Sequence, residues 1–295
     1  MPNSGKLGTR SASDVIRAGC TESLVALKKY HRRALKLEAE PIHQIRVGTR
    51  RLRAALRIFA DLMDEQWARE LEAELRWLAH LLGAVRDLDV LRERLRQDVD
   101  PEDRRAMIHV QRILAGRHRD AQAAMKEGLQ SERYSELVER LHAGTLAPQL
   151  MTGAGAPALE SLMPMLSDAW KKLARNGNKL SFNDDSLRYH HVRKSAKHVR
   201  YASEMLEEDL ESKDRRNSEK FIDHMKELQN LLGELQDSVV AAQTLERLME
   251  LHPGHKAGIQ SLIEAQGRAE KKARGNFPKA WSRAKEKEFR KWMHG

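Results

Sequence analysis

The stretch that decides the fold is PIHQIRVGTRRLRAALRIFA, residues 41–60. It contains five arginines and one histidine but no acidic residue. Pro41 fits the first turn of a helix, where its missing N–H needs no partner. At 3.6 residues per turn, one face of such a helix is apolar and roughly the opposite face is cationic. The apolar face carries Ile45, Leu52, Leu56 and Phe59, and the cationic face carries His43, Arg46, Arg50, Arg53 and Arg57.

This cationic face, called the first ladder below, concentrates like charges along one strip. Such charges repel one another on a helix surface and oppose its folding. A solvated basic face is the usual explanation of an arginine-rich helix, but such faces normally mix both signs. Residues 41–60 contain no aspartate or glutamate. We therefore expect the first ladder to have an anionic partner.

A second copy of the pattern begins at His190, 147 residues after His43. Residues 190–201 read HHVRKSAKHVRY, and Val192 and Val199 match the apolar positions of the first copy. The second ladder comprises His190, Arg193, Lys197 and Arg200.

Another shared stretch follows each ladder. It reads LAHLLG at residues 78–83, followed by Asp87, and LQNLLG at residues 228–233, followed by Asp237. The two aspartates are 150 residues apart, so the second half contains a small insertion. Two matches in the same order and at nearly one offset indicate an internal duplication, whose period is too long for a solenoid repeat. We expect two helical halves that each present one ladder to a shared groove.

These motifs resemble those of the CHAD family, the conserved histidine α-helical domain. The first ladder fits HxxRVxxRRLR, the second fits HxxRxxxKxxRY, and the LLGxxxD segments fit as well, so the resemblance covers roughly residues 11–292. It implies an all-α fold of two helical bundles, related by a pseudo-two-fold axis around a basic central groove. It also implies that the protein binds inorganic polyphosphate. The CYTH triphosphatase module that is sometimes fused to this family has an ExExK signature, which is missing here. We therefore expect a standalone CHAD domain without catalytic activity.

The second half departs from the first near the far end of its ladder. His198 stands at the position of Arg51, and Glu204 stands at the position of Arg57. We therefore expect the second ladder to be shorter at this end.

The candidate polyphosphate-binding residues are the members of the two ladders. A nearby phosphate favours the charged form of an imidazole, so we expect the histidine that heads each ladder to make binding weaker above neutral pH. Four further cations and two carboxylates are supporting candidates, the carboxylates because an Arg–carboxylate pair fixes the geometry of a guanidinium. The supporting candidates are Lys28, Arg51, Lys194, His198, Asp87 and Asp237.

Turn-forming residues divide the chain. Residues 1–10 are expected to form a flexible tail, and residues 11–293 a single domain of two helical halves. The halves cover residues 11–143 and 158–293. Residues 144–157, which are rich in glycine, alanine and proline, form the predicted linker between them.

Apolar residues recur at helical spacing along the chain, and no alternating strand pattern bounded by turns occurs, so the predicted fold class is all-α. Helices are predicted over residues 13–40, over 65–97, from the capping sequence Asp100-Pro101-Glu102-Asp103 onward, and over 214–251. The chain is predicted to leave helical structure over residues 176–185. Residues 275–278 (GNFP) are expected to divide the C-terminal segment into two helices.

Composition limits the function classes. The 295 residues carry a formal net charge of +10, which favours an acidic partner. Cys20 is the sole cysteine, so an intramolecular disulfide and a cysteine-rich zinc site are excluded. A metal site built on His190, His191 and His198 lacks HExxH spacing, and no phosphate-cradling GxxxxGK[ST] loop occurs. We expect no cofactor, no metal and no enzyme activity.

Two alternatives to polyphosphate binding stay open. A protein that binds nucleic-acid backbones would also be basic, but the chain has no helix-turn-helix, zinc-finger or RNP motif. Only 5% of the residues are aromatic, which is poor for stacking single-stranded bases. The other alternative is a scaffold protein on polyphosphate granules. No apolar run approaches the roughly 20 residues of a membrane span, so we expect a cytoplasmic protein without membrane contact.

Overall fold

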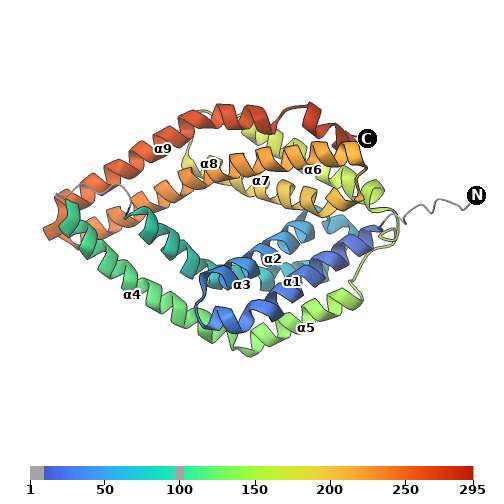
Figure 1. Ribbon diagram of the computed structural model, residues 1–295, viewed down its shortest axis with the longest axis horizontal. Helices are drawn as coiled ribbons and strands as arrows, with labels where there is room; N and C mark the ends of the chain where they lie inside the picture. Colours follow the sequence, from blue (N-terminus) through green and yellow to red (C-terminus); the bar gives the residue numbers. More distant parts are fainter. Residues whose placement is uncertain (1–9, 97–102, 295) are drawn as a thin grey trace, which may run out of the picture.

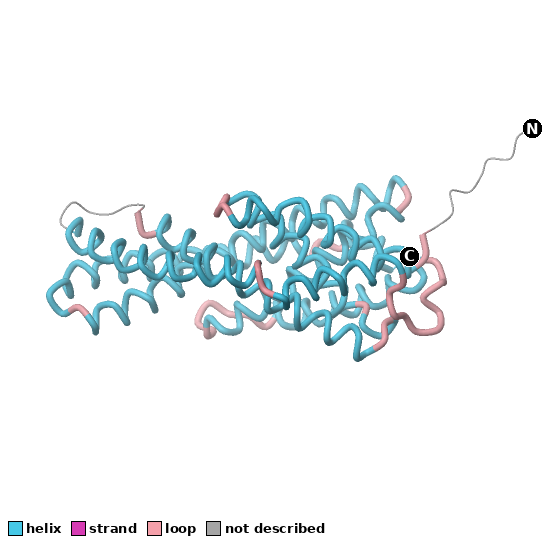
Figure 2. Tube along the Cα trace, turned by 90° about the horizontal axis from the view of Figure 1, so that it is seen from below, coloured by secondary structure: helices cyan, strands magenta, loops and turns pink. Residues whose placement is uncertain are grey.

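The computed structural model describes residues 10–96 and 103–294. Within these ranges the chain forms α-helices and short 3-10 helices but no β-strand, which confirms the predicted all-α class (Figure 2). The α-helices are α1 (Ala12–Leu35), α2 (Ala39–Ile58), α3 (Glu65–Arg94), α4 (Arg104–Leu129), α5 (Glu132–Leu146), α6 (Ala158–Asn178), α7 (Ser186–Leu206), α8 (Ser212–Leu251) and α9 (Lys256–Ala284). The 3-10 helices are η1 (Ala60–Leu62), η3 (Glu207–Asp209), η4 (Pro253–His255) and η5 (Glu288–His294).

The helices form two groups, one above the other in Figure 1, that come together towards the ends of an elongated molecule. In this view α1, α2 and α5 lie in the lower half, and α6 and α7 lie in the upper half. The long helices α8 and α9 run together along the upper side, and α3 and α4 run along the lower side. Helix α2 packs on α1, α3 and α7, whereas α7 packs on α6, α8 and α2. The two ladder helices are therefore direct neighbours at the centre.

Both ladder helices bury the apolar face that the sequence predicts. Ile45 and Leu52 of α2 and Val192 and Val199 of α7 are buried and belong to one continuous core cluster. A second, smaller core joins the ends of α3 and α4 to α8 and α9. Burial of a side chain of this size stabilises the fold by about 1.5–3 kcal/mol. The apolar faces thus hold α2 and α7 in place, and the ladders occupy other faces.

The predicted helix over residues 13–40 is wrong at both ends. Ser11 caps α1, because its hydroxyl accepts a hydrogen bond from the Asp14 N–H and Asp14 in turn accepts one from the Ser11 N–H. The helix ends at Leu35, and Leu37 adopts a positive φ of 65° that lets the chain turn back. Helix α2 then begins at Ala39, so Pro41 does lie in its first turn.

The predicted division of the C-terminal segment at residues 275–278 is also wrong. Helix α9 continues from Lys256 to Ala284 with Pro278 inside it. A proline in a helix interior costs about 3 kcal/mol because a hydrogen bond is lost. Phe277 and Trp281 flank it and are buried in the core, where Trp281 stacks on Trp170. Packing of these rings outweighs the local preference for a break.

Other predicted boundaries differ by a few residues. Helix α5 extends to Leu146, into the predicted linker. Arg10, assigned to the tail, forms an ion pair with Asp209 at 2.8 Å. The break over 176–185 is confirmed between α6 and α7, and the helix over 214–251 corresponds to α8. The rest of the predicted tail and most of the cap at 100–103 lie outside the described residues. Across the described residues, no helix combines the length and apolarity needed to cross a bilayer.

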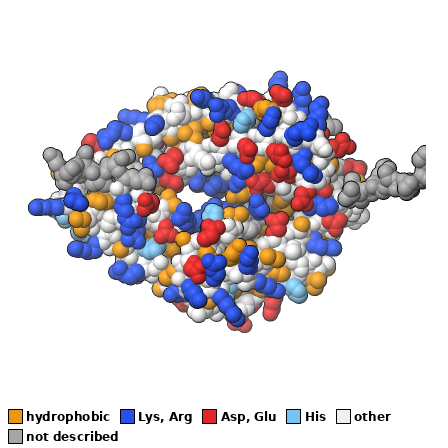
Figure 3. Space-filling view, in the orientation of Figure 1, with side chains coloured by type: hydrophobic (Ala, Val, Ile, Leu, Met, Phe, Trp, Pro, Cys, Tyr) orange, Lys and Arg blue, Asp and Glu red, His pale blue; other side chains and the backbone are white. Residues whose placement is uncertain are grey.

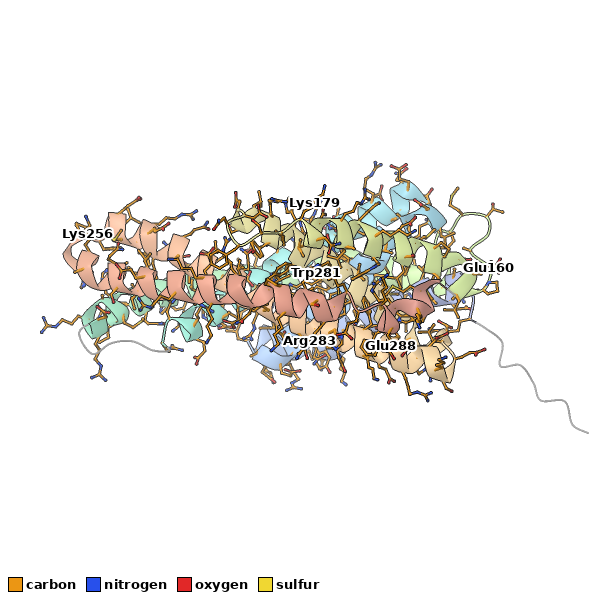
Figure 4. The ribbon with its side chains drawn as sticks, turned by 90° about the horizontal axis from the view of Figure 1, so that it is seen from above. Glu160, Lys179, Lys256, Trp281, Arg283 and Glu288 are labelled. Carbon is orange, nitrogen blue, oxygen red and sulfur yellow. The ribbon has the colours of Figure 1, made fainter. Side chains whose placement is uncertain are left out.

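Gly177 lets the end of α6 approach α9 closely. A Cβ at this position would lie 2.5 Å from Cζ2 of Trp281, whose indole N–H donates to Asn178 at 2.9 Å. Figure 4 shows Trp281 on α9 beside the end of α6 that leads to Lys179. We expect Gly177→Ala to lower the free energy of unfolding by about 1–3 kcal/mol, because the buried indole must move. Denaturant unfolding measures this change.

The matched control is Gly267→Ala in α9, where a Cβ would meet nothing within 4 Å. Alanine is the better helix former, so this variant is expected to raise the free energy of unfolding by about 0.5–1 kcal/mol. Equal effects of the two substitutions would refute the close approach of Trp281 to Gly177.

Candidate anion-binding cleft

Helices α2, α3, α7 and α8 enclose a cleft of ≈ 710 Å³. Figure 3 shows Lys and Arg side chains around the hollow at the centre of the molecule. Nine arginine and lysine side chains line the cleft against two aspartates, so its lining carries a large positive excess. The charged and histidine residues of the lining are Arg46, Arg50, Arg53, Arg57, Arg76, Arg86, Arg193, Lys194, Lys197, His43, His80, His190, His198, Asp87 and Asp237.

The structure brings most of the sequence-predicted residues into this cleft. All five members of the first ladder line it from α2, and three of the four members of the second ladder line it from α7. Four of the six supporting candidates line it as well, namely Lys194, His198, Asp87 and Asp237. Eight of the nine ladder residues thus line one cleft.

Three predicted residues do not line the cleft. Arg200 donates hydrogen bonds to Gln229 at 3.0 Å and to Glu204 at 2.8 Å, and its guanidinium stacks over Tyr201. Arg51 lies 3.5 Å from the same Glu204. This glutamate replaces an arginine of the first half, and its charge holds both arginines away from the cleft. Lys28 lies on α1, which does not line the cleft.

The glycine of each LLG motif lies beside a ladder arginine, and the contact is unusually close only at Gly83. A Cβ at Gly83 would lie 2.9 Å from Nη1 of Arg46, and a Cβ at Gly233 would lie 3.7 Å from Nη2 of Arg193. Arg46 is only 6% exposed, so its guanidinium is pressed against the α3 backbone. Helix α3 continues through Gly83, and this close contact explains the glycine there.

Aspartates four residues after these glycines face the same arginines. Nη2 of Arg46 lies 3.5 Å from Oδ1 of Asp87, which is the outer limit of a hydrogen bond. Burial raises the pKa of Asp237, while nearby Arg193 acts in the opposite direction. Nη1 of Arg46 and Nε of Arg193 are buried without a hydrogen-bond partner among the described residues. The carboxylates therefore compensate these guanidinium groups only in part.

Positive charge is concentrated most strongly where the two ladders meet. Burial, followed by Arg193, Arg50 and Arg46, lowers the pKa of Lys197 to about 7. Burial and then Arg50 lower the pKa of Arg46 to about 10. Among the described residues, no hydrogen bond or ion pair joins Arg50 or Lys197 to another side chain. Without a bound anion, burial and mutual repulsion of these central cations therefore raise the free energy of the folded protein.

One end of the first ladder is neutralised within the protein. Oε1 of Glu72 on α3 accepts hydrogen bonds from Nη2 of Arg53 at 2.9 Å and from Nη2 of Arg57 at 2.6 Å. Burial alone would raise the pKa of Glu72, but the bonds from Arg53 and Arg57 lower it overall. These two arginines are therefore less available to an external anion than Arg50.

The cleft histidines differ in their surroundings. Nδ1 of His190 lies 2.8 Å from Oε1 of Gln236, and burial lowers the pKa of this histidine. Burial, then Arg57 and Arg53, lower the pKa of His198 to about 4, so it is neutral at pH 7. His43 is exposed at the cleft, whereas His191 is exposed outside it. Within the described part of the chain, no three His, Cys, Asp or Glu side chains are placed to hold a metal ion.

Sequence reasoning missed the contribution of α3. Arg76, His80 and Arg86 line the cleft although they belong to neither ladder. Arg76, His80 and Gly83 follow helical spacing beside the buried leucines of α3, which is the signal that would have found the first two. At the matching positions of α8, 150 residues later, stand Lys226, Asn230 and Gln236, of which only Gln236 lines the cleft. The α3 wall is therefore more cationic than the α8 wall.

Residues 18–246 match the CHAD domain. The chain belongs to the CHAD family. Within these 295 residues no CYTH module is detected. The motifs that suggested this family from the sequence are the ones that build the cleft.

Two curated relatives of this CHAD protein come from Mycobacterium tuberculosis, the uncharacterized proteins MT2285 and Rv2226. Each is 29% identical to it over 265 residues, which cover 83% of this chain and 47% of the relative. The chain thus spans about half the length of the curated relatives that it matches.

Two solved structures share the fold. PptA from Streptomyces chartreusis has a TM-score of 0.76 and 20% identity, with 92% of this chain and 100% of that chain covered. The CHAD domain from the plant Ricinus communis has a TM-score of 0.71 and 23% identity, with 97% and 93% covered. At these identities the likeness concerns the fold.

Proposed function

We propose that this CHAD protein binds inorganic polyphosphate in the cleft between its two ladders. The observation that carries the proposal is the convergence of Arg50 and Lys197 with the buried Arg46 and the half-buried Arg193. These four cations come from two helices, and only the aspartates of the LLGxxxD segments lie near them as counter-charges. A polyanion would relieve their mutual repulsion, because it supplies the negative charge that the protein lacks there.

Polyphosphate suits such a site because it is a slim chain with about one negative charge per unit and no base to read. The planar fork of an arginine can meet two phosphate oxygens. A hydrogen bond to a charged group contributes about 1.5–3 kcal/mol, and micromolar affinity requires about 8.2 kcal/mol. Four or five such contacts would therefore be enough, and the central cations supply that number.

The enclosure of the cleft favours polyphosphate over nucleic acid, which is the second candidate. The cations lie on inner faces of α2, α3 and α7 rather than on a convex surface that could follow a duplex. Tyr201 is the sole Phe, Tyr or Trp of the lining, and its ring is 5% exposed and covered by Arg200. Single-stranded bases would thus find little surface for stacking.

The matched contacts of the two halves support a pseudo-two-fold arrangement around a basic groove. Arg46 lies against Gly83 and faces Asp87 in the first half, and in the second half Arg193 lies beside Gly233, at a longer distance, with Asp237 as a nearby charge. A polyphosphate chain has equivalent units along its length, so two similar half-sites suit it. The proposal assigns no catalytic group, cofactor or metal to the cleft.

Polyphosphate binding would also place a cytoplasmic CHAD protein on polyphosphate granules. A scaffold role on such granules is compatible with this proposal, because the ligand would be the granule polymer itself. The aspartates, Lys194 and His198 act as supporting residues in this arrangement, whereas Lys28, Arg51 and Arg200 are not part of it.

The proposal is tested by titrating the protein with long-chain polyphosphate at physiological salt. Competition with duplex DNA, single-stranded RNA and triphosphate is measured in the same assay. We expect micromolar or tighter binding of polyphosphate that an equal phosphate concentration of nucleic acid does not displace. Salt dependence is expected as well, because counterions are released from a polyanion on binding.

Two results would overturn the proposal. Nucleic acid that binds as tightly as polyphosphate would favour the second candidate. Failure of every polyanion to bind would leave the ladders without an external ligand.

A further inference from the structure

Lys197 lies in the cleft as a half-buried amine surrounded by groups that bind phosphate. Its side chain has no hydrogen bond or ion pair to any residue of the ranges 10–96 and 103–294. The charged groups that act on it come from three elements, namely Arg193 of α7, Arg50 and Arg46 of α2, and Asp237 of α8. The amine is thus accessible from the cleft and is not engaged by a carboxylate.

The surroundings also make this amine a nucleophile near neutral pH. Burial and the neighbouring arginines lower the pKa of Lys197 to about 7. An ordinary lysine has a pKa of about 10.4, so only about a thousandth of it is unprotonated at pH 7.5. Lysines that are desolvated beside other cations are the ones that act as nucleophiles in proteins. A polyphosphate-binding role uses only the charge of Lys197 and leaves this property unexplained.

We propose that Lys197 is a modification site that acyl phosphates acylate after binding in the cleft through their phosphate group. The lone pair of Nζ attacks the carbonyl carbon, and the bond between that carbon and the phosphate oxygen breaks. Inorganic phosphate leaves with the bonding electrons and takes up the proton that the amine loses. The products are an amide on Lys197 and inorganic phosphate, so no oxidant, reductant or further reactant is needed.

The neighbouring arginines are the reason for proposing an acyl phosphate as the acyl donor. Arg46, Arg50 and Arg193 would hold the phosphate of the donor beside Nζ and stabilise the charge that develops on it as it leaves. Holding two reactants together converts a bimolecular reaction into an effectively unimolecular one. An uncharged acyl donor has no such attachment, and the cleft of ≈ 710 Å³ accommodates a small acyl phosphate easily.

Acylation would also regulate the cleft, a consequence that rests on the proposed function. The amide removes one positive charge and two N–H donors from the point where the ladders meet. Bound polyphosphate and an acyl phosphate would compete for the same arginines, so the loaded protein is protected from modification.

The test uses acetyl phosphate with the full-length wild-type protein at pH 7.5, followed by mass-spectrometric mapping of acetyl-lysine over time. Lys271, an exposed lysine on α9 outside the cleft, is the internal reference. We expect Lys197 to be acetylated at least about tenfold faster than Lys271, because the cleft arginines hold the phosphate of the donor beside Nζ of Lys197. Inorganic phosphate is expected to slow the reaction of Lys197. No polyphosphate is present, so this result is independent of polyphosphate binding.

A second measurement isolates the role of the arginines. For Lys197, the acetylation rate with acetyl phosphate is divided by the acetylation rate with the uncharged donor N-hydroxysuccinimidyl acetate. Both rates depend on the nucleophilicity of the same amine, so this factor cancels in the ratio. In Arg50→Gln this ratio at Lys197 is expected to fall about tenfold, the value of one charge-assisted contact to phosphate. In the control Arg175→Gln, on the exposed face of α6, it is expected to stay unchanged. Acetylation of Lys197 no faster than of Lys271, or an unchanged ratio in Arg50→Gln, would overturn the proposal.

Discussion

Replacing Arg50 and Lys197 together by glutamate is expected to weaken polyphosphate binding by at least about a hundredfold. Each residue is expected to make one charge-assisted hydrogen bond to phosphate, which contributes about 1.5–3 kcal/mol. A loss of about 1.4 kcal/mol corresponds to a factor of ten in affinity. The two new carboxylates also repel the ligand. Isothermal titration with long-chain polyphosphate measures the loss.

The same double variant is expected to fold, and to be at least as stable as the wild type. Among the described residues no ion pair or hydrogen bond joins Arg50 or Lys197 to a carboxylate, so none is broken by their replacement. The glutamates would instead lie beside Arg46 and Arg193, whose mutual repulsion they reduce. Removal of such unfavourable charges commonly stabilises a protein by about 0.5–2 kcal/mol. Unfolding in denaturant therefore shows whether lost binding reflects lost structure.

The matched control is Lys271→Glu with Lys272→Glu, two exposed positions on α9 outside the cleft. It changes the net charge by the same amount, but at physiological salt exposed charges act over only about 8 Å. We expect at most a threefold change in affinity. A loss as large as that of the cleft variant would mean that net charge, rather than the cleft, determines binding.

Affinity for polyphosphate is expected to fall as pH rises from about 7 to 9, mainly because of Lys197. In the free protein this amine has a pKa of about 7, owing to burial and the neighbouring arginines. Bound phosphate favours its charged form and raises the pKa, so binding above pH 7 takes up a proton. Because binding takes up at most one proton at this group, the affinity falls by no more than about tenfold per pH unit. Titrations at half-unit steps of pH measure the slope.

The control for this prediction is Lys197→Arg, which keeps the cation charged throughout the range and is expected to flatten the slope. His190 and His198 contribute on the acidic side instead, because burial lowers the pKa of His190, and burial with Arg57 and Arg53 lowers that of His198 to about 4. An equally steep slope in Lys197→Arg would show that another group takes up the proton.

The free energy of unfolding of the free protein is expected to change with pH in the direction opposite to the affinity for polyphosphate. The folded-state pKa of Lys197 lies below its unfolded value of about 10.4, so between these values the unfolded chain binds more protons. The free energy of unfolding from this group therefore rises as pH increases above 7, while affinity for the anion falls. Both pH dependences have the same cause, because burial and the neighbouring arginines lower the pKa of Lys197 when no anion is bound.

Sequence periodicity was sufficient to find the two ladder helices and the all-α class. Helical spacing is a local property, so the apolar face with Ile45 and Leu52 and the cationic face with Arg46 and Arg50 could be read directly. The order of the ladders and LLGxxxD segments also identified the CHAD family, which the match over residues 18–246 confirms. The expectation that both ladders face one groove came from the internal duplication and the family resemblance, because helical spacing alone does not place one helix beside another.

Tertiary contacts decided which cations reach the cleft. Arg200 has the right spacing, but Glu204 and Gln229 hold it elsewhere. Arg76 and His80 share helical spacing with Gly83, but only the packing of α3 against α2 places this face of α3 in the cleft. Pro278 misled the prediction of α9 for a similar reason, since burial of its neighbours outweighs a local helix breaker.

The sequence by itself determined where the positive charge is placed along each helix, because residue spacing fixes the face on which a side chain lies. Only the tertiary structure decided how much free energy is needed to bury these charges and to bring them close together. Lys197 and Arg46 acquire lowered pKa values because two helices from distant parts of the chain bury their cations against one another. Desolvation and repulsion depend on distances through space, and these exist only once the chain has folded.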